Sequence, residues 1–193
     1  LKLLGIAERT ESGIEQRVHP TMVPKSSAIA RIDGVLNAVA VDGDFVGRLM
    51  LVGPGAGGDA TASSVVGDIA DIARGTALDV MGRPSDRLEP YRQAGVRAHK
   101  GGYYVRLSVH DRPGALAAIA GRMAERGLSL ESIVQRQRAP HPAASATQAP
   151  ADPQSIIMIT YETTEAAIRE ALERIRDDGH VADMPQFIRI EPL

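Results

Sequence analysis

The chain has 193 residues, 44% of them hydrophobic and 24% charged, and its 22 basic and 24 acidic residues give a net charge of −2. This balance argues against a nucleic-acid partner or an anionic membrane surface, because both favour a strongly basic face. The absence of cysteine excludes disulfides, thiolate metal sites and a cysteine nucleophile, and it fits a cytoplasmic location. No apolar run reaches the roughly 18 residues of a membrane span, so no membrane partner is expected.

The first 74 residues have the pattern of a small sheet followed by a helix. In chain order, the pattern predicts strands at residues 1–8 and 16–23, a short helix ending at Arg31, strands at 37–41 and 45–52, and a helix over about 61–74. Ser26 or Ser27 can cap the short helix, and Asp42-Gly43-Asp44 predicts a tight hairpin turn. Because Leu1 is not Met and already lies in a strand pattern, we expect further residues to precede it.

The second half of the chain has a different pattern. In residues 75–100 the apolar residues do not recur with a helical or strand period, which predicts a linker on the surface. Residues 101–193 then predict a strand over 103–109, a helix ending at Gly127, strands at 128–135 and 155–161, a helix from Thr163 or Thr164 to Arg176, and a strand at 187–190. This β-α-β-β-α-β order is the ferredoxin-like unit, so the fold class is α+β. Residues 138–154, rich in Pro, Ala and Ser, predict a mobile hairpin loop.

A glycine loop follows the predicted strand at 45–52. Gly53, Gly55 and Gly58 satisfy the G-x-G-x-x-G spacing of a dinucleotide site, in which the backbone approaches a phosphate at a helix N-terminus. However, no strand follows the helix at the spacing of a β-α-β unit, and Asp71 lies inside the helix instead of after such a strand. From these residues alone, a tight turn is an equal alternative to a cofactor site.

A second candidate is Asp111-Arg112-Pro113-Gly114, which joins a predicted strand to a predicted helix. Pro113 suits the first helical turn, and Gly114 leaves the helix amides open to a small carboxylate. The alternative is a loop in which the Asp111 side chain caps those amides. His19 is expected to be a packed, hydrogen-bonded histidine, and Asp68 is expected to be solvated. Neither a metal site nor a catalytic residue is predicted.

Several segments resemble one known family. Residues 17–24 (RVHPTMVP), 34–41 (with Asn37-Ala38-Val39), 50–63 (with the glycine loop) and the helix at 65–69 resemble the C-terminal part of homoserine dehydrogenase. From Tyr103 onward the chain resembles an ACT domain, the amino-acid-sensing module that ends many bacterial homoserine dehydrogenases. The resemblance implies that residues 1–74 are the end of the catalytic and dimerisation domain, a partial mixed α/β sheet whose helix returns to the nucleotide-binding domain. A linker at 75–100 and an ACT domain at 101–193 would follow.

The resemblance implies a function for the parent protein: NAD(P)-dependent interconversion of L-homoserine and L-aspartate 4-semialdehyde, towards threonine, methionine and isoleucine. The residues it places at the cofactor are Gly55, Ala56, Gly57, Gly58 and Thr61. The family's N-terminal glycine fingerprint, acidic substrate residues and catalytic lysine match no position here. We therefore expect this chain alone to bind no cofactor and to be inactive. Asp59-Ala60 stands where the family usually has a proline, so the start of the helix is not fixed.

The ACT resemblance implies allosteric regulation by an amino acid such as threonine. The residues it places at this ligand are Asp111, Arg112, Pro113, Gly114, Ala115 and Leu116, and the strand at 131–134 of a second chain would close the site. A homodimer or higher homo-oligomer is therefore expected. The alternatives are a stand-alone ACT-type amino-acid sensor and an oligomerisation module without catalysis. In either case the first 74 residues should expose apolar surface unless another chain covers it.

Overall fold

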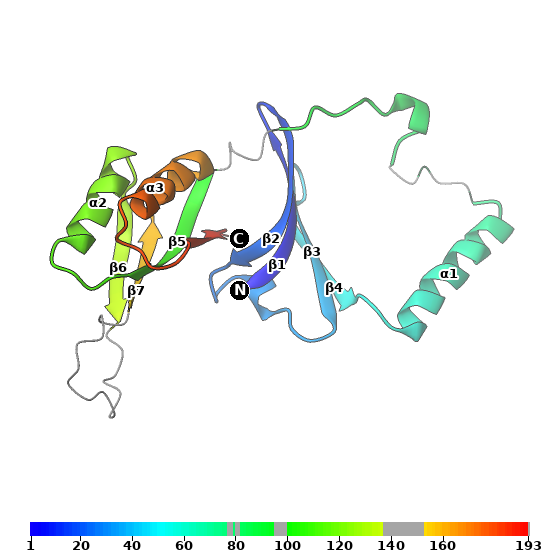
Figure 1. Ribbon diagram of the computed structural model, residues 1–193. Coiled ribbons are helices and arrows are strands. Elements are labelled where there is room, and N and C mark those ends of the chain that lie inside the picture. The colour runs from blue at the N-terminus through cyan, green and yellow to red at the C-terminus, as the bar shows by residue number, and fades with distance from the viewer. Residues whose placement is uncertain (77–78, 80–81, 95–99, 137–152, 193) are drawn as a thin grey trace. The chain divides into compact units, whose positions relative to one another are not determined.

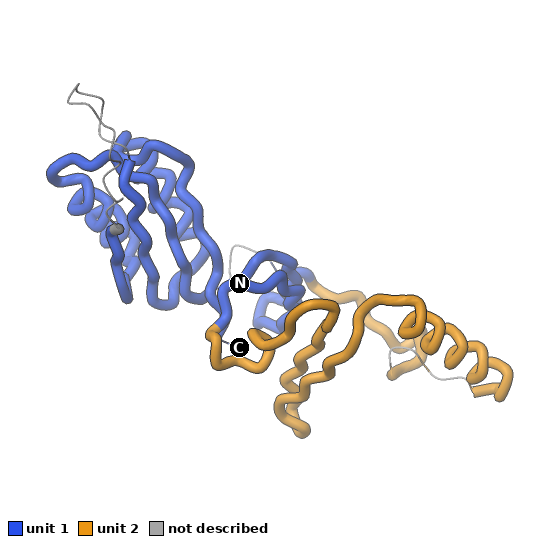
Figure 2. The backbone as a smooth tube through the Cα atoms, turned by 90° about the horizontal axis from the view of Figure 1, so that it is seen from below, with its two compact units in different colours: residues 1–23, 93–192 blue, residues 24–92, 193 orange. Residues whose placement is uncertain are grey.

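The structure of the chain is a computed structural model. It describes residues 1–76, 79, 82–94, 100–136 and 153–192. It has two compact units: residues 1–23 together with 93–192, and residues 24–92 (Figure 2). The loop expected at 138–154 lies outside the described residues, except for its last two positions.

The first unit is built on one mixed sheet (Figure 1). Its strands are β1 (Lys2–Thr10), β2 (Gly13–Met22), β5 (Lys100–Val109), β6 (Leu130–Arg136), β7 (Gln154–Thr160), the short β8 (Thr163–Thr164) and β9 (Gln186–Ile190). The strand order is β1-β2-β9-β5-β7-β6, with β8 paired to β5. Helix α2 (Ala115–Glu125) lies between β5 and β6, and α3 (Glu165–Asp177) precedes β9. The run from β5 to β9 is thus the predicted ferredoxin-like unit, and the α+β class is confirmed.

One hydrophobic core lies between the two helices and one face of this sheet. Alternate residues of β5 and β7 meet apolar positions of α2 and α3, including Tyr103, Val105, Leu107, Ile119, Met123, Ile156, Met158, Ile168 and Ile175. The hydroxyl of Thr164 accepts a hydrogen bond from the Ala167 N–H at 3.3 Å and so caps α3, as the sequence predicts. None of the helices in the described ranges combines the length and the apolar character needed to cross a membrane.

The hairpin of β1 and β2 belongs to this same unit. Its strands pair from Lys2 with Thr21 to Thr10 with Gly13. Strand β2 then pairs in parallel with β9 at its end. The sequence assigned this hairpin to the segment 1–74, whereas its contacts are with residues 93–192. The end of the expected surface linker also packs here: Ala94 is buried, and its N–H donates to the Ile14 carbonyl at 3.0 Å.

The second unit is a two-stranded sheet followed by a helix. Its elements are the 3₁₀ turn η1 (Ala28–Arg31), β3 (Leu36–Gly43), β4 (Gly47–Pro54), α1 (Gly58–Ala73) and the turn η2 (Ser85–Arg87). The hairpin turn lies at residues 44–46 instead of 42–44, because Gly43 stays paired with Gly47, which takes a left-handed φ of 72°. Within this chain the apolar residues of β3, β4 and α1 are largely exposed, as expected: Val39, Val41, Leu51, Val65, Ile69 and Ile72.

Candidate functional site

The glycine loop lies where the sequence places it, between β4 and α1. Helix α1 begins at Gly58, earlier than the position near Thr61 that the sequence predicts, and the Thr61 N–H donates to the Gly57 carbonyl at 3.1 Å. Gly57 has a φ of 123°, which side chains rarely allow. A Cβ atom built at Gly57 or Gly58 would meet nothing within 4 Å. The backbone at this helix N-terminus is therefore open to a group that approaches from outside.

The surroundings of the loop form only one side of a binding site. A shallow hollow of about 340 Å³ lies beside it, lined by Asn37, Ala38, Val39, Leu51, Val52, Gly53, Pro54 and Gly55. Of the five residues that the resemblance places at a cofactor, only Gly55 lines this hollow. Ala56 and Gly57 lie in the exposed loop, and Gly58 and Thr61 lie in the exposed first turn of α1. The chain supplies an accessible glycine loop here but no enclosing walls.

A larger cavity, of about 530 Å³, lies at the junction of β5 and α2. It is lined by Val109, His110, Asp111, Arg112, Gly114, Ala115, Leu116, Ala117, Ala120, Ile133, Gln135, Gln154 and Ile156. The structure thus brings together five of the six residues expected at the amino-acid site, and Pro113 is not among the lining residues. Pro113 also precedes α2, which begins at Ala115, so the expectation that it forms the first helical turn is wrong.

The chemistry of this cavity suits a small zwitterion. Gly114, at the N-cap of α2, has a left-handed φ of 89° and no side chain that could cap the helix. The alternative, in which the Asp111 side chain caps the amides of this helix end, is not what the structure shows. Arg112 and Asp111 line the same cavity, which gives it one basic and one acidic group beside the helix amides. Its volume lies in the range of about 300–1,000 Å³ that is common for small-molecule sites.

Val109, His110, Ala117 and Ala120, which flank the predicted motif, were not predicted. Four wall residues far from the motif in sequence were also missed by the sequence reasoning: Ile133, Gln135, Gln154 and Ile156. They lie on the neighbouring strands β6 and β7, where Gln135 pairs with Ile156. The signal that could have found them is the two-residue alternation of these strands, because Ile156 shares a face with the buried Met158. The sequence assigned residues 131–134 of a second chain to this site, whereas Ile133 of the same chain lines it; a second chain's contribution stays a prediction.

Other residues singled out in the sequence have structural roles. His19 is partly buried, and its Nδ1 lies 2.8 Å from the Thr21 hydroxyl, as expected for a packed histidine. Asp68 and Asp71 are exposed on α1, and Asp71 lies 3.9 Å from Arg74. Within the described residues there is no group of three or more His, Asp or Glu side chains placed to hold a metal ion.

Comparisons with known proteins match two families along the chain. The homoserine dehydrogenase family model matches residues 1–70, and the ACT domain model matches residues 103–180. Homoserine dehydrogenase from Pseudomonas aeruginosa is 37% identical over 100% of this chain and 44% of its own length. The enzyme from Mycobacterium tuberculosis is 33% identical over 99% of this chain and 43% of its own length. The chain therefore spans less than half the length of these relatives.

Solved structures agree with this assignment. The crystal structure of a homoserine dehydrogenase from Thiobacillus denitrificans is 37% identical and has a TM-score of 0.82, over 99% of this chain and 42% of that one. A homoserine dehydrogenase from Staphylococcus aureus is 21% identical with a TM-score of 0.58, which supports the fold alone. Over its whole length the chain is therefore similar to homoserine dehydrogenases, with the family model matched at residues 1–70 and the ACT domain model at residues 103–180.

Proposed function

We propose that the chain is the C-terminal part of a cytoplasmic homoserine dehydrogenase, which interconverts L-homoserine and L-aspartate 4-semialdehyde with NAD(P). The observation that carries this proposal is the 37% identity to a homoserine dehydrogenase over the whole chain. In this view the chain contributes a glycine loop beside the cofactor and a regulatory domain. The catalytic lysine and the nucleotide-binding domain would come from the rest of the parent protein.

The glycine loop fits a cofactor as one wall of its site. Gly57 and Gly58 place no side chain over the backbone, and the N-terminus of α1 favours a negatively charged group. When bound, NAD(P) supplies or accepts the hydride. In this proposal residues 55–58 and Thr61 only help to position it, because this part of the chain does not enclose a pocket.

The cavity at β5 and α2 is, in this proposal, the site of an amino-acid effector such as threonine. Arg112 and the amides in the first turn of α2 would receive its carboxylate, and Asp111 would receive its ammonium group. The apolar side chains of Val109, Ile133 and Ile156 would surround its side chain. A homodimer or higher homo-oligomer, in which a second chain's β6 approaches this cavity, is part of the same proposal.

Two measurements test these roles separately. Residues 1–193 should show no NADP-dependent homoserine oxidation, whereas the parent protein that contains them should show it; an inactive parent overturns the catalytic proposal. Saturating threonine should raise the melting temperature of residues 1–193. A ligand present at about 100 times its Kd adds roughly 2.7 kcal/mol to the free energy of unfolding. If no shift follows with threonine, methionine or isoleucine, the regulatory role is overturned. An effector response beside an inactive parent would favour the stand-alone sensor.

A further inference from the structure

Strand β2 buries polar side chains along one face. Glu15, Arg17 and Thr21 are buried, whereas Val18 on the opposite face is exposed. This reverses the usual pattern of a half-buried strand, in which apolar residues face the interior. The buried face of β2 must therefore be held by hydrogen bonds and ion pairs.

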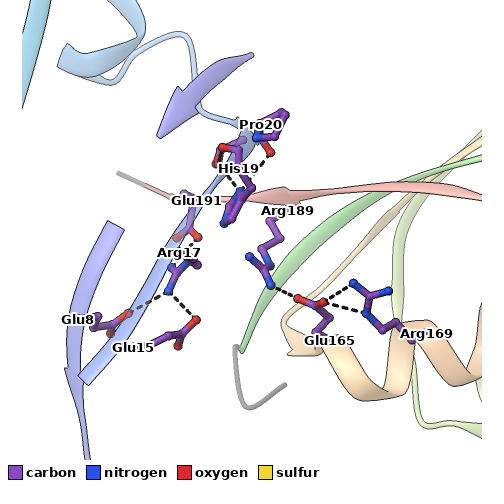
Figure 3. Close-up of polar contacts among 10 residues, drawn as sticks. Glu8, Glu15, Arg17, His19, Pro20, Glu165, Arg169, Arg189 and Glu191 are labelled. Carbon is purple, nitrogen blue, oxygen red and sulfur yellow. Dashed lines mark hydrogen bonds and ion pairs between the residues drawn. The ribbon is translucent and has the colours of Figure 1, made fainter. Parts of the chain in front are cut away.

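Arg17 is the centre of these contacts (Figure 3). Its Nη1 lies 2.8 Å from Glu15 Oε1, and its Nη2 lies 2.7 Å from Glu191 Oε1. Glu8 lies farther away, at 3.9 Å. Only 3% of the Arg17 side chain is exposed, as against 10% of Glu191. One guanidinium therefore joins the hairpin to the residue that directly follows β9.

The charges make this contact sensitive to the loss of one partner. Burial alone would lower the pKa of Arg17, but hydrogen bonds and charge from Glu191 and then Glu15 raise it above its ordinary value. The planar guanidinium reaches both carboxylates at once, which a lysine ammonium does less well. Removal of the arginine would take away the cation that both buried carboxylates contact, which is costlier than loss of an exposed pair.

The strand pairing between the hairpin and the rest of the sheet is short. Strands β2 and β9 pair only at Thr21 with Arg189 and at Met22 with Ile190. The Glu191 N–H adds one hydrogen bond to the Met22 carbonyl, at 2.9 Å. The clustered hydrophobic core is drawn from residues 103–175, with partly buried neighbours up to Phe187, and includes none of the hairpin. The ferredoxin-like core is thus complete without β1 and β2.

We propose that Arg17 holds the β1–β2 hairpin on strand β9 as a separately opening unit, which can leave the sheet while the ferredoxin-like core stays folded. The hairpin lies within the segment that matches homoserine dehydrogenase, and the core lies largely within the ACT match. The polar contact of Arg17 with Glu191 is then the reversible joint between the β1–β2 hairpin and the ferredoxin-like core. It involves neither the cavity nor the glycine loop, and so does not depend on their proposed ligands.

Native-state hydrogen exchange on residues 1–193, resolved by residue with NMR, tests this proposal without any variant. The Glu191 N–H reports on the joint, and the Tyr103 N–H, which donates to the Thr160 hydroxyl at 3.0 Å, reports on the core. The Glu191 amide should exchange about tenfold faster or more, with a weaker dependence on denaturant, because it opens by a smaller unfolding step. Equal rates with equal denaturant dependence would overturn the proposal.

Variants then test the role of Arg17. In Arg17→Met the Glu191 amide should exchange about tenfold faster or more, while the Tyr103 amide stays within about twofold. Arg17→Lys, which keeps the charge, provides a milder change if Arg17→Met does not fold. The control is Arg48→Met, since Arg48 pairs with Asp42 at 2.8 Å but both side chains are mostly exposed, at 60% and 68%. Acceleration of both amides alike, or of neither, in the Arg17 variants contradicts the proposal.

Discussion

Asn37 occupies the space that a side chain on Gly55 would need. A Cβ atom built on Gly55 would lie 1.7 Å from Asn37 Nδ2 and 2.4 Å from its Cγ. Two backbone contacts fix this approach: Asn37 pairs with Gly53 across β3 and β4, and the Gly55 N–H donates to the Val35 carbonyl at 3.4 Å. Glycine is favoured at position 55 by this neighbour and not by a positive φ.

Gly55→Ala should therefore loosen the start of the glycine loop. Because the blocking atoms belong to the exposed side chain of Asn37, the cost should lie near the lower end of the roughly 1–3 kcal/mol for overpacking. The residue-55 amide should then exchange about fivefold faster. The control is Gly53→Ala, since a Cβ atom there would meet nothing within 4 Å. The double variant Asn37→Ala/Gly55→Ala should recover most of the loss. Similar behaviour of the two single alanine variants would show that Asn37 does not constrain the loop.

The cavity wall offers a second matched pair of variants. Ile133 lines the cavity and is 40% exposed, while its neighbour Val134 is 43% exposed but does not line it. Ile133→Phe should fill part of the cavity and remove most of the proposed threonine-induced rise in melting temperature. That rise corresponds to roughly 2.7 kcal/mol of added unfolding free energy at 100 times Kd. Val134→Phe should keep that rise. Thermal melting with and without threonine measures both, and an unchanged response in Ile133→Phe would place the ligand elsewhere.

The ferredoxin-like fold was predictable because its signals are local. The alternation from Tyr103 to Val109 marks β5, and Thr164 marks the start of α3 by its capping hydroxyl. The pairing of β2 with β9 was not predictable in this way. Its main side-chain contact joins Arg17 to Glu191, 174 positions apart, and a buried polar pair leaves no hydrophobic period to detect.

The candidate cavity was predictable in part for the same reason. Residues at the junction of a strand and a helix, such as Asp111 and Gly114, are contiguous in sequence, so a short motif reveals them. Gln135 and Gln154 come together only through the pairing of β6 with β7, across a long insertion. The hollow beside Asn37 likewise depends on strand register, which composition does not specify.

Glu165 should make the protein sensitive to acid. Burial alone would raise its pKa, but hydrogen bonds from Arg189 and Arg169 lower it below the ordinary value of 4.5. The stability that the ionised group contributes is present above pH 4.5 and is lost as the pH falls through the lower folded-state pKa. Glu165→Gln should flatten the fall in melting temperature below pH 4.5, and the exposed Glu162→Gln should not. Equal pH profiles for wild type and Glu165→Gln would contradict this.

Tyr103 should ionise only near pH 12. Burial and then the nearby charge of Glu165 raise its pKa to about 12, although Arg189 opposes this shift. Because the folded-state pKa exceeds the unfolded value of 10.0, the corresponding stability is complete below pH 10 and is lost as the pH rises towards 12. The tyrosinate absorbance of the four tyrosines should thus include a step near pH 12. That step should vanish in Tyr103→Phe and remain in the exposed Tyr161→Phe. If the step near pH 12 vanished in Tyr161→Phe instead, the Tyr103 hydroxyl would have to reach water. The core between β5 and α3 would then be more open than the burial of Tyr103 implies.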